Sequence, residues 1–417
     1  MKKIVLGLLL LSAMIAYGGS DDIIYVPEAE PAVRVEAPPE AAEPDIIYEP
    51  EEPPELEGAE EIEEPEDAWW MEGAEHEAAE EPEVREPRSP RLFFCFLTGR
   101  QVSRAQQRKR PVSIIIDNLR QAQPTVGVGS ADIIYEAIVE GGSTRLLMIL
   151  ADYEDVPSFG SVRSARDYYV DLSQSHDAIF VHAGGSESAY RQMFDRNIDR
   201  LDGVNRVDRL DGMRMHLSAH FYRDAARRRV MAFEHTLMTS GDRLVAGIRQ
   251  AGYRTRHAVD FTGPFNFHAE FTELPEDSAA AYFVAVPFSA HFIPEFIFNP
   301  DDGLYYRRQF GGPHLDGATG EQLRFENVIV LFAEYRSMGT ADGALACELV
   351  GTGFGFYISG GRFITIRWAK DSRDGPMRLF NLDHSDLYLN PGRSYIAVTS
   401  TSFNRSVIIN AEQREIS

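Results

Sequence analysis

The chain has 417 residues, two cysteines and a formal net charge of −24; it is longer than one average domain, and it cannot build a cysteine-rich metal site. The acidic excess is local, since residues 21–90 hold 26 Asp or Glu against 3 Arg, whereas residues 91–417 hold 39 acidic and 36 basic side chains. This nearly neutral remainder argues against nucleic-acid binding, which favours strongly basic domains.

The first 90 residues form two segments of different composition. In residues 1–20, Lys2 and Lys3 precede an apolar run over 4–16, which is too short for a membrane span and is typical of a secretory signal cleaved near Gly18. An uncleaved N-terminal anchor is the alternative. Residues 21–90 hold 12 of the 23 prolines, so we expect an acidic, disordered spacer, with a docking site for a basic partner as the alternative.

The next segments are a basic linker over residues 91–110 and a region over 111–260 in which strand and helix patterns alternate. Apolar runs predict strands at 112–116, 146–151 and 178–181. Capping residues and apolar spacing predict helices from Ala131 to Gly141, from about Ala165 to Gln174, after Ser186, over 218–227 and over 240–250. The alternation indicates an α/β domain, a sandwich with a mixed sheet.

Residues 261–417 indicate a β-rich antiparallel C-terminal module. Asp302-Gly303 and Gly360-Gly361 each separate two strand-like runs and predict hairpins. The glycines of residues 351–355 are followed by neither a helix nor a lysine, which favours a twisted strand over a nucleotide site. Cys95 and Cys347 can pair in an exported protein, but nothing in the sequence requires it.

The segment Gly160 to Asp167, GSVRSARD, carries the strongest functional signal. Arg163 and Arg166 lie between two buried strands, and Arg145 lies on the strand before them. Guanidinium groups match carboxylate and phosphate geometry with paired hydrogen bonds, and the following helix N-terminus would add backbone N–H donors. We expect an anion-binding clamp here. The alternative is a set of buried arginines that pair with Asp117, Asp132 or Asp167 and fix the fold.

Polar residues at strand ends extend this candidate site. Asp117 and Asn118 end the first predicted strand, where α/β sheets usually place ligands. Asp117 could hold Mg²⁺ beside a phosphate, or the pair could form an Asx turn. His182 ends a neighbouring strand and could donate to a phosphate or act as a base, or be structural. His216 and His220 have a zinc-like spacing without the accompanying glutamate.

Several blocks in order resemble the YerB-like family of bacterial extracytoplasmic proteins, most of them lipoproteins. They include VSIIIDN (112–118), ADIIYEAIVEGGSTR (131–145), GSVRSARDYYVDL (160–172), DAIFVHAGGS (177–186) and EHTLMTSG (234–241). The resemblance implies a two-part architecture outside the cytoplasm and supplies no reaction. This chain lacks a cysteine near the end of its apolar run. The layout of residues 143–185 is also similar to the LytR-CpsA-Psr enzymes, which attach phosphate-linked glycopolymers to the cell wall.

Together these observations predict an exported cell-envelope protein that binds an anionic ligand, a phosphorylated glycan or a lipid-linked phosphate. Arg145, Arg163, Arg166, Asn118 and His182 would form the ligand site. Two alternatives remain open. One is a Mg²⁺-dependent phosphotransferase or hydrolase using Asp117. The other is a protein-interaction scaffold. Membrane contact would occur only through an uncleaved N-terminal segment.

Overall fold

The computed structural model describes residues 92–204, 208–210, 213–215, 217–340 and 343–410. The predicted signal and the whole predicted spacer lie outside these residues, as does His216. Four α-helices are described: α1 (Arg104–Gln107), α2 (Asp167–Gln174), α3 (Glu187–Asp195) and α4 (Gly241–Ala251). The 3-10 helices are η1 (Arg120–Ala122), η2 (Val128–Ser130), η3 (Glu140–Gly142), η4 (Leu217–His220), η5 (Arg227–Arg229), η6 (Phe233–Thr236) and η7 (Thr401–Phe403).

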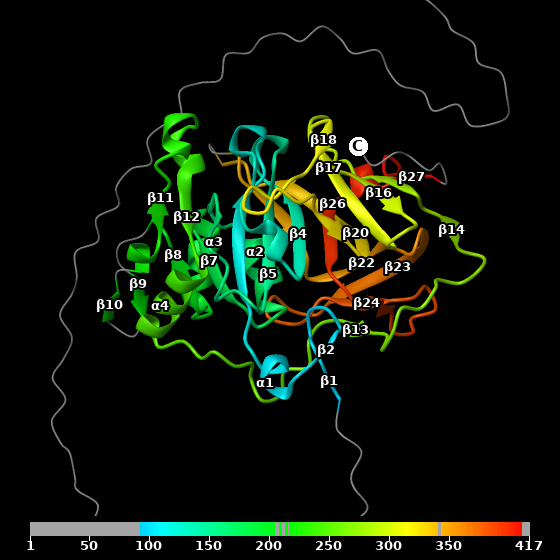
Figure 1. Cartoon of the computed structure of the whole chain (residues 1–417), viewed down its shortest axis with the longest axis horizontal. Helices are drawn as coiled ribbons and strands as arrows, with labels where there is room; N and C mark the ends of the chain where they lie inside the picture. Colours follow the sequence, from blue (N-terminus) through cyan, green and yellow to red (C-terminus); the bar gives the residue numbers. More distant parts are fainter. Residues whose placement is uncertain (1–91, 205–207, 211–212, 216, 341–342, 411–417) are drawn as a thin grey trace, which may run out of the picture. The chain divides into compact units, whose positions relative to one another are not determined.

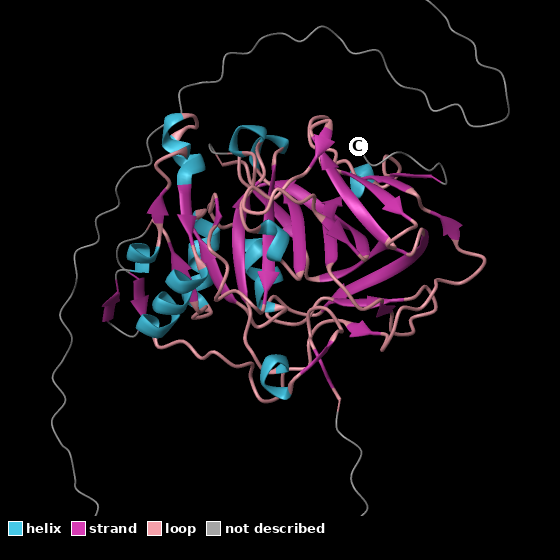
Figure 2. Ribbon diagram, in the orientation of Figure 1, coloured by secondary structure: helices cyan, strands magenta, loops and turns pink. Residues whose placement is uncertain are grey.

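Strands dominate the described residues (Figures 1 and 2). They are β1 (Phe93–Phe94), β2 (Gln101–Val102), β3 (Val112–Asp117), β4 (Ile133–Ile138), β5 (Thr144–Leu150), β6 (Phe159–Gly160), β7 (Ile179–His182), β8 (Arg200–Asp202), β9 (Asp208–Leu210), β10 (Met213–Met215), β11 (Tyr222–Arg223), β12 (Leu237–Thr239), β13 (Asn266–Phe267), β14 (Ala279–Ala280), β15 (Phe283–Ala285), β16 (Glu295–Asn299), β17 (Leu304–Gln309), β18 (Gly312–Pro313), β19 (Arg324–Phe325), β20 (Asn327–Ser337), β21 (Leu345–Glu348), β22 (Gly351–Ser359), β23 (Arg362–Lys370), β24 (Arg378–Phe380), β25 (Tyr388–Leu389), β26 (Ser394–Ser400) and β27 (Ile408–Asn410).

One 12-stranded sheet runs through both predicted modules. Its main path is β14-β23-β22-β20-β26-β4-β5-β3-β7-β8, with β21 on β20 and β24 on β23. Strand β26 pairs in parallel with both β20 and β4, so a strand near the end of the chain joins the N-terminal and C-terminal parts. A second sheet, of six strands, contains β15 to β19 and β27.

The central strands of the large sheet are buried on both faces because other elements cover each of them. Helices α2 and α3 pack against one face through side chains such as Tyr168, Leu172 and Met193. Helix α4 and the six-stranded sheet pack against the other face, with Leu244 and Phe296 in the same core cluster as Ile114. All six residues of β3 and all six of β4 are buried. The result is a mixed-sheet α/β sandwich with a β-rich C-terminal part, as the sequence predicts.

Local signals placed several elements correctly. Ser186 caps α3 by accepting a hydrogen bond from the Ala189 N–H at 3.2 Å. Gly252 ends α4 with φ of 67°, in the left-handed region that glycine adopts without strain. The predicted Asp302-Gly303 hairpin joins β16 to β17, and Gly360-Gly361 joins β22 to β23.

Two predicted helices are wrong. The segment after Ala131 forms β4, a central strand between β5 and β26, because an apolar run buried on both faces satisfies strand and helix spacing equally well. The segment 218–227 forms η4, strand β11 and the start of η5 instead of one helix. Inside the predicted basic linker, β1, β2 and α1 are formed, and Arg110 is buried against Asp199.

Candidate functional site

The candidate residues gather at one edge of the large sheet. Strands β3, β4, β7, β8 and β26 all run in the same direction, so their carboxyl ends meet at this edge, and β5 begins there. Asp117 ends β3 and His182 ends β7, while Arg145 lies at the start of β5 opposite Asp117. The strand directions therefore explain why residues distant in sequence come together, as expected for an α/β sheet.

Arg145 is buried and has no carboxylate partner among the described residues. Its side chain makes one hydrogen bond, from Nη1 to the Ser164 carbonyl oxygen at 2.6 Å, and the residue is 8% exposed. No carboxylate of the described residues lies within 4.0 Å of its guanidinium. Burial, together with the nearby charges of Arg166 and Arg163, lowers the pKa of Arg145 to about 10. A guanidinium has five N–H donors, so most of this one's hydrogen-bonding capacity is unused by side chains and backbone.

Arg166 is paired within the fold. Its Nε and Nη2 atoms donate to Glu140 Oε1 and Oε2 at 2.5 and 2.7 Å, and Nη1 donates to the Ala165 carbonyl oxygen. Burial acts to raise the pKa of Glu140, but these contacts with Arg166 hold it below its usual value. Glu140 follows β4 at the same sheet edge. The alternative of internal pairing is therefore correct for this arginine, with a carboxylate that the sequence analysis did not consider.

Arg163 and a histidine share one carboxylate oxygen. Asp117 Oδ2 lies 2.7 Å from His235 Nδ1 and 3.4 Å from Arg163 Nε. The side chains of Asp117 and His235 are 2% and 6% exposed. Burial acts to raise the pKa of Asp117, but the hydrogen bond from His235 and the Arg163 charge hold it below its usual value. Sequence reasoning missed His235, although it lies in the block EHTLMTSG that supports the family resemblance.

Asn118 and His182 are buried at the same edge. Asn118 Nδ2 donates to Glu136 Oε1 at 2.9 Å and to Thr144 Oγ1 at 2.8 Å, whereas its Oδ1 is buried without a partner among the described residues. His182 Nδ1 contacts the Gly184 carbonyl oxygen at 2.8 Å, and its Nε2 is likewise buried without a described partner. Each side chain thus makes hydrogen bonds within the fold through one polar atom, while its other polar atom has no described partner.

The Asp117 carboxylate does not fit the predicted Mg²⁺ site. Its Oδ1 accepts the Leu119 N–H at 3.0 Å, and its Oδ2 contacts His235. Mg²⁺ prefers carboxylates together with free coordination positions for water and phosphate. Within the part of the chain that the structure describes, no group of three or more His, Cys, Asp or Glu side chains could hold a metal ion.

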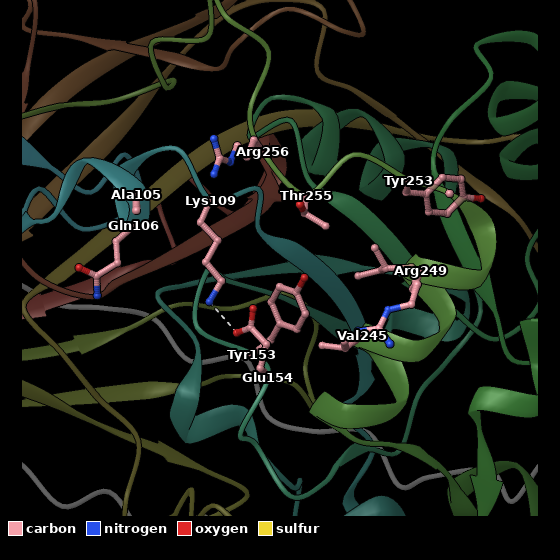
Figure 3. Close-up of a pocket in the computed structure, with 12 residues that line it drawn as sticks. Ala105, Gln106, Lys109, Tyr153, Glu154, Val245, Arg249, Tyr253, Thr255 and Arg256 are labelled. Carbon is pink, nitrogen blue, oxygen red and sulfur yellow. Dashed lines mark hydrogen bonds and ion pairs between the residues drawn. The ribbon is translucent and has the colours of Figure 1, made fainter.

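A hollow lies away from the arginines, near the start of β3 and beside α4 (Figure 3). It has a volume of about 660 Å³. Lys109 donates to Glu154 at 2.6 Å and lies 5.5 Å from the centre of the Tyr153 ring. Arg249 and Arg256 line the same hollow. It is therefore separate from the candidate site and offers arginines for control substitutions.

The two cysteines, Cys95 and Cys347, are free thiols. Burial raises the pKa of each. No disulfide therefore joins the two parts of the chain.

Among the residues that the structure describes, no helix has the length and apolar character needed to cross a membrane.

Comparison with known proteins identifies the family. The model for the N-terminal domain of DUF3048, a protein family of unknown function, matches residues 97–254, and the model for its C-terminal domain matches residues 284–396. The chain belongs to this YerB-like family. It is 28% identical over 306 residues to YerB of Bacillus subtilis (strain 168), whose name marks it as a proposed lipoprotein. That alignment covers 72% of this chain and 85% of the relative.

A solved structure supports the same assignment. The crystal structure of Bacillus subtilis YerB matches with a TM-score of 0.64 and 25% sequence identity. The match covers 76% of this chain and 99% of the solved chain. The family description assigns no reaction.

Proposed function

We propose that this protein binds an anionic ligand of the cell envelope, a phosphorylated glycan or lipid-linked phosphate, at the arginine cluster of Arg145, Arg163 and Arg166. The observation that carries this proposal is the state of Arg145. Burying a cation without an opposite charge is costly, and Arg145 is buried, unpaired with any described carboxylate, and close to two other arginines. A bound anion would supply the missing counter-charge.

The ion pairs around the cluster leave a small excess of positive charge, which favours an anionic ligand. Asp117 pairs with Arg163 and Glu140 pairs with Arg166, so three arginines face two paired carboxylates, and Arg145 has no ion pair among the described residues. Arg163 and Arg166 keep part of their surface open, with side chains 20% and 13% exposed. The cluster therefore suits a ligand that presents one negative charge to a partly open edge, such as a phosphodiester.

The location that we propose is extracytoplasmic. It rests on the lysine-led apolar segment of residues 1–20 and on the lipoprotein name carried by the B. subtilis relative. A ligand of the envelope is consistent with that location. The similarity to the layout of the LytR-CpsA-Psr enzymes stays a prediction, and so does the scaffold alternative.

The test measures binding of diglycerol phosphate, a small phosphodiester, to the full chain by isothermal titration calorimetry. Arg145→Met should weaken binding at least tenfold while the melting temperature stays the same or rises, because the variant removes a buried, unpaired charge and keeps apolar bulk. Arg249→Met removes the same charge from the hollow away from the arginines and should bind like wild type. Equal binding by wild type and Arg145→Met, or no binding by wild type, would overturn the proposal.

A further inference from the structure

We propose that this site also hydrolyses the phosphodiester that it binds, with His235 as the general base. The inference rests on the proposed function, since the arginine cluster would hold the substrate. It starts from a second observation, the buried pair of Asp117 and His235 with 2.7 Å between Oδ2 and Nδ1. An imidazole oriented by a buried carboxylate is a recurring arrangement for proton transfer.

The hydrogen bond to Asp117 decides which imidazole nitrogen can accept a proton. An ionised carboxylate only accepts hydrogen bonds, so Nδ1 carries the proton that it donates to Asp117. Nε2 is then the basic atom. The described carboxylate oxygen within 4.0 Å of it is Glu234 Oε1 at 3.8 Å, beyond hydrogen-bond distance, and the Glu234 side chain is 45% exposed. The proposal places the reacting water molecule at Nε2.

Backbone contacts hold this pair in place before any ligand arrives. The Asp117 N–H donates to the Ser161 carbonyl oxygen at 2.9 Å, and the Ser161 hydroxyl donates to the His235 carbonyl oxygen. Ser161 therefore joins the end of β3 to the segment that carries His235. A base fixed in this way avoids the cost of being oriented during the reaction.

Arg163 brings the base and the anion site together. Its Nε lies 3.4 Å from the same Asp117 oxygen that contacts His235, and its Nη1 donates to the Glu234 carbonyl oxygen at 3.3 Å. The guanidinium is thus adjacent to the imidazole. A phosphodiester held by Arg163 and Arg145 would present its phosphorus next to a water molecule bound at His235 Nε2.

The reaction balances with water as the only co-reactant. His235 Nε2 takes a proton from water as the water oxygen forms a bond to phosphorus. The bond from phosphorus to one ester oxygen then breaks, and the departing alkoxide takes the proton from Nε2 as it leaves. The products are a phosphate monoester and an alcohol, and His235 returns to its starting state. Asp117 is a positioning residue, because it acts through the imidazole.

The test follows cleavage of bis(4-nitrophenyl) phosphate by the full chain, with product analysis in ¹⁸O-labelled water. His235→Asn places an amide donor where Nδ1 was and removes Nε2. It should lower kcat about 100-fold or more, within the range of general-base contributions, with KM and diglycerol phosphate binding nearly unchanged. Asp117→Asn should also lower kcat more than it changes KM. Added imidazole should partly restore the activity of His235→Ala.

The possible outcomes separate this inference from the binding proposal. Release of 4-nitrophenol with ¹⁸O in the phosphate monoester, lost in His235→Asn, supports hydrolysis at phosphorus. Binding of diglycerol phosphate without turnover overturns the hydrolysis and leaves the binding site intact. Turnover that is equal in wild type and His235→Asn overturns the role of His235. Failure of wild type to bind any diester overturns the proposed function as well.

Discussion

Breaking the buried ion pair between Glu136 and Arg307 should lower the free energy of unfolding strongly. Both side chains are 0% exposed, and Arg307 Nη2 lies 2.7 Å from Glu136 Oε2. Glu136 lies on β4 and Arg307 on β17 of the six-stranded sheet, so the pair joins the two sheets. Glu136 also accepts hydrogen bonds from Asn118, Thr144 and the Tyr395 hydroxyl.

Arg307→Met should destabilise the protein by about 3–5 kcal/mol, the usual cost of leaving one partner of a buried pair uncompensated. Three neutral donors would remain around Glu136, and none of them supplies a positive charge. The double variant Glu136→Gln/Arg307→Met should recover much of that loss, because no buried charge is left without a partner.

The assay is urea unfolding of the full chain followed by circular dichroism. Arg336→Met provides the matched control, since it breaks an exposed pair with Glu348 whose side chains are 65% and 48% exposed, and it should leave the midpoint nearly unchanged. A loss below about 1 kcal/mol for Arg307→Met would refute the reasoning from buried-pair energetics.

Three other predictions concern acid stability, packing and thiols. Burial acts to raise the pKa of Asp177, but hydrogen bonds from Arg254 and His257 hold it well below its usual value. The contribution of Asp177 to the free energy of unfolding is therefore complete above about pH 4 and is lost as the pH falls further. Asp177→Asn should flatten the dependence of the urea midpoint on pH between 7 and 2. Gly241→Ala should cost about 1–3 kcal/mol, measured by thermal unfolding, because the added carbon would meet the Tyr153 carbonyl oxygen. Denatured, unreduced protein should titrate two thiols, and a titre of zero would contradict the free cysteines.

Much of the fold could be predicted from local patterns. The capping serine at 186, the glycine after α4 and the turn at Asp302-Gly303 act within a few residues, and each ended or began an element where the sequence placed it. The segment containing β4 could not be assigned in this way. Its apolar residues fit a helix face as well as a strand buried on both sides, and only the partners β5 and β26 decide between them.

The candidate site depended on partners that lie far away in the sequence. The spacing of Arg163 and Arg166 indicated a shared edge, and the sheet does place them close to Arg145. The sequence does not show which arginine binds a carboxylate, because Glu140 and Arg166 are 26 positions apart. The pairing of Asp117 with His235 spans 118 positions. A histidine two residues before a short strand carries no local signal of its role.

The contrast between Arg166 and Arg145 explains why sequence alone left the clamp undecided. Both are arginines at the same sheet edge, yet Arg166 binds Glu140 through two parallel hydrogen bonds, whereas Arg145 contacts a single carbonyl oxygen. A paired arginine is explained by the fold that it stabilises. A buried and unpaired one is a cost to that fold, and selection for function is the reason that proteins keep such costs. A ligand is therefore expected at Arg145, which has no carboxylate partner among the described residues, and the two paired arginines and His235 define what that ligand would meet.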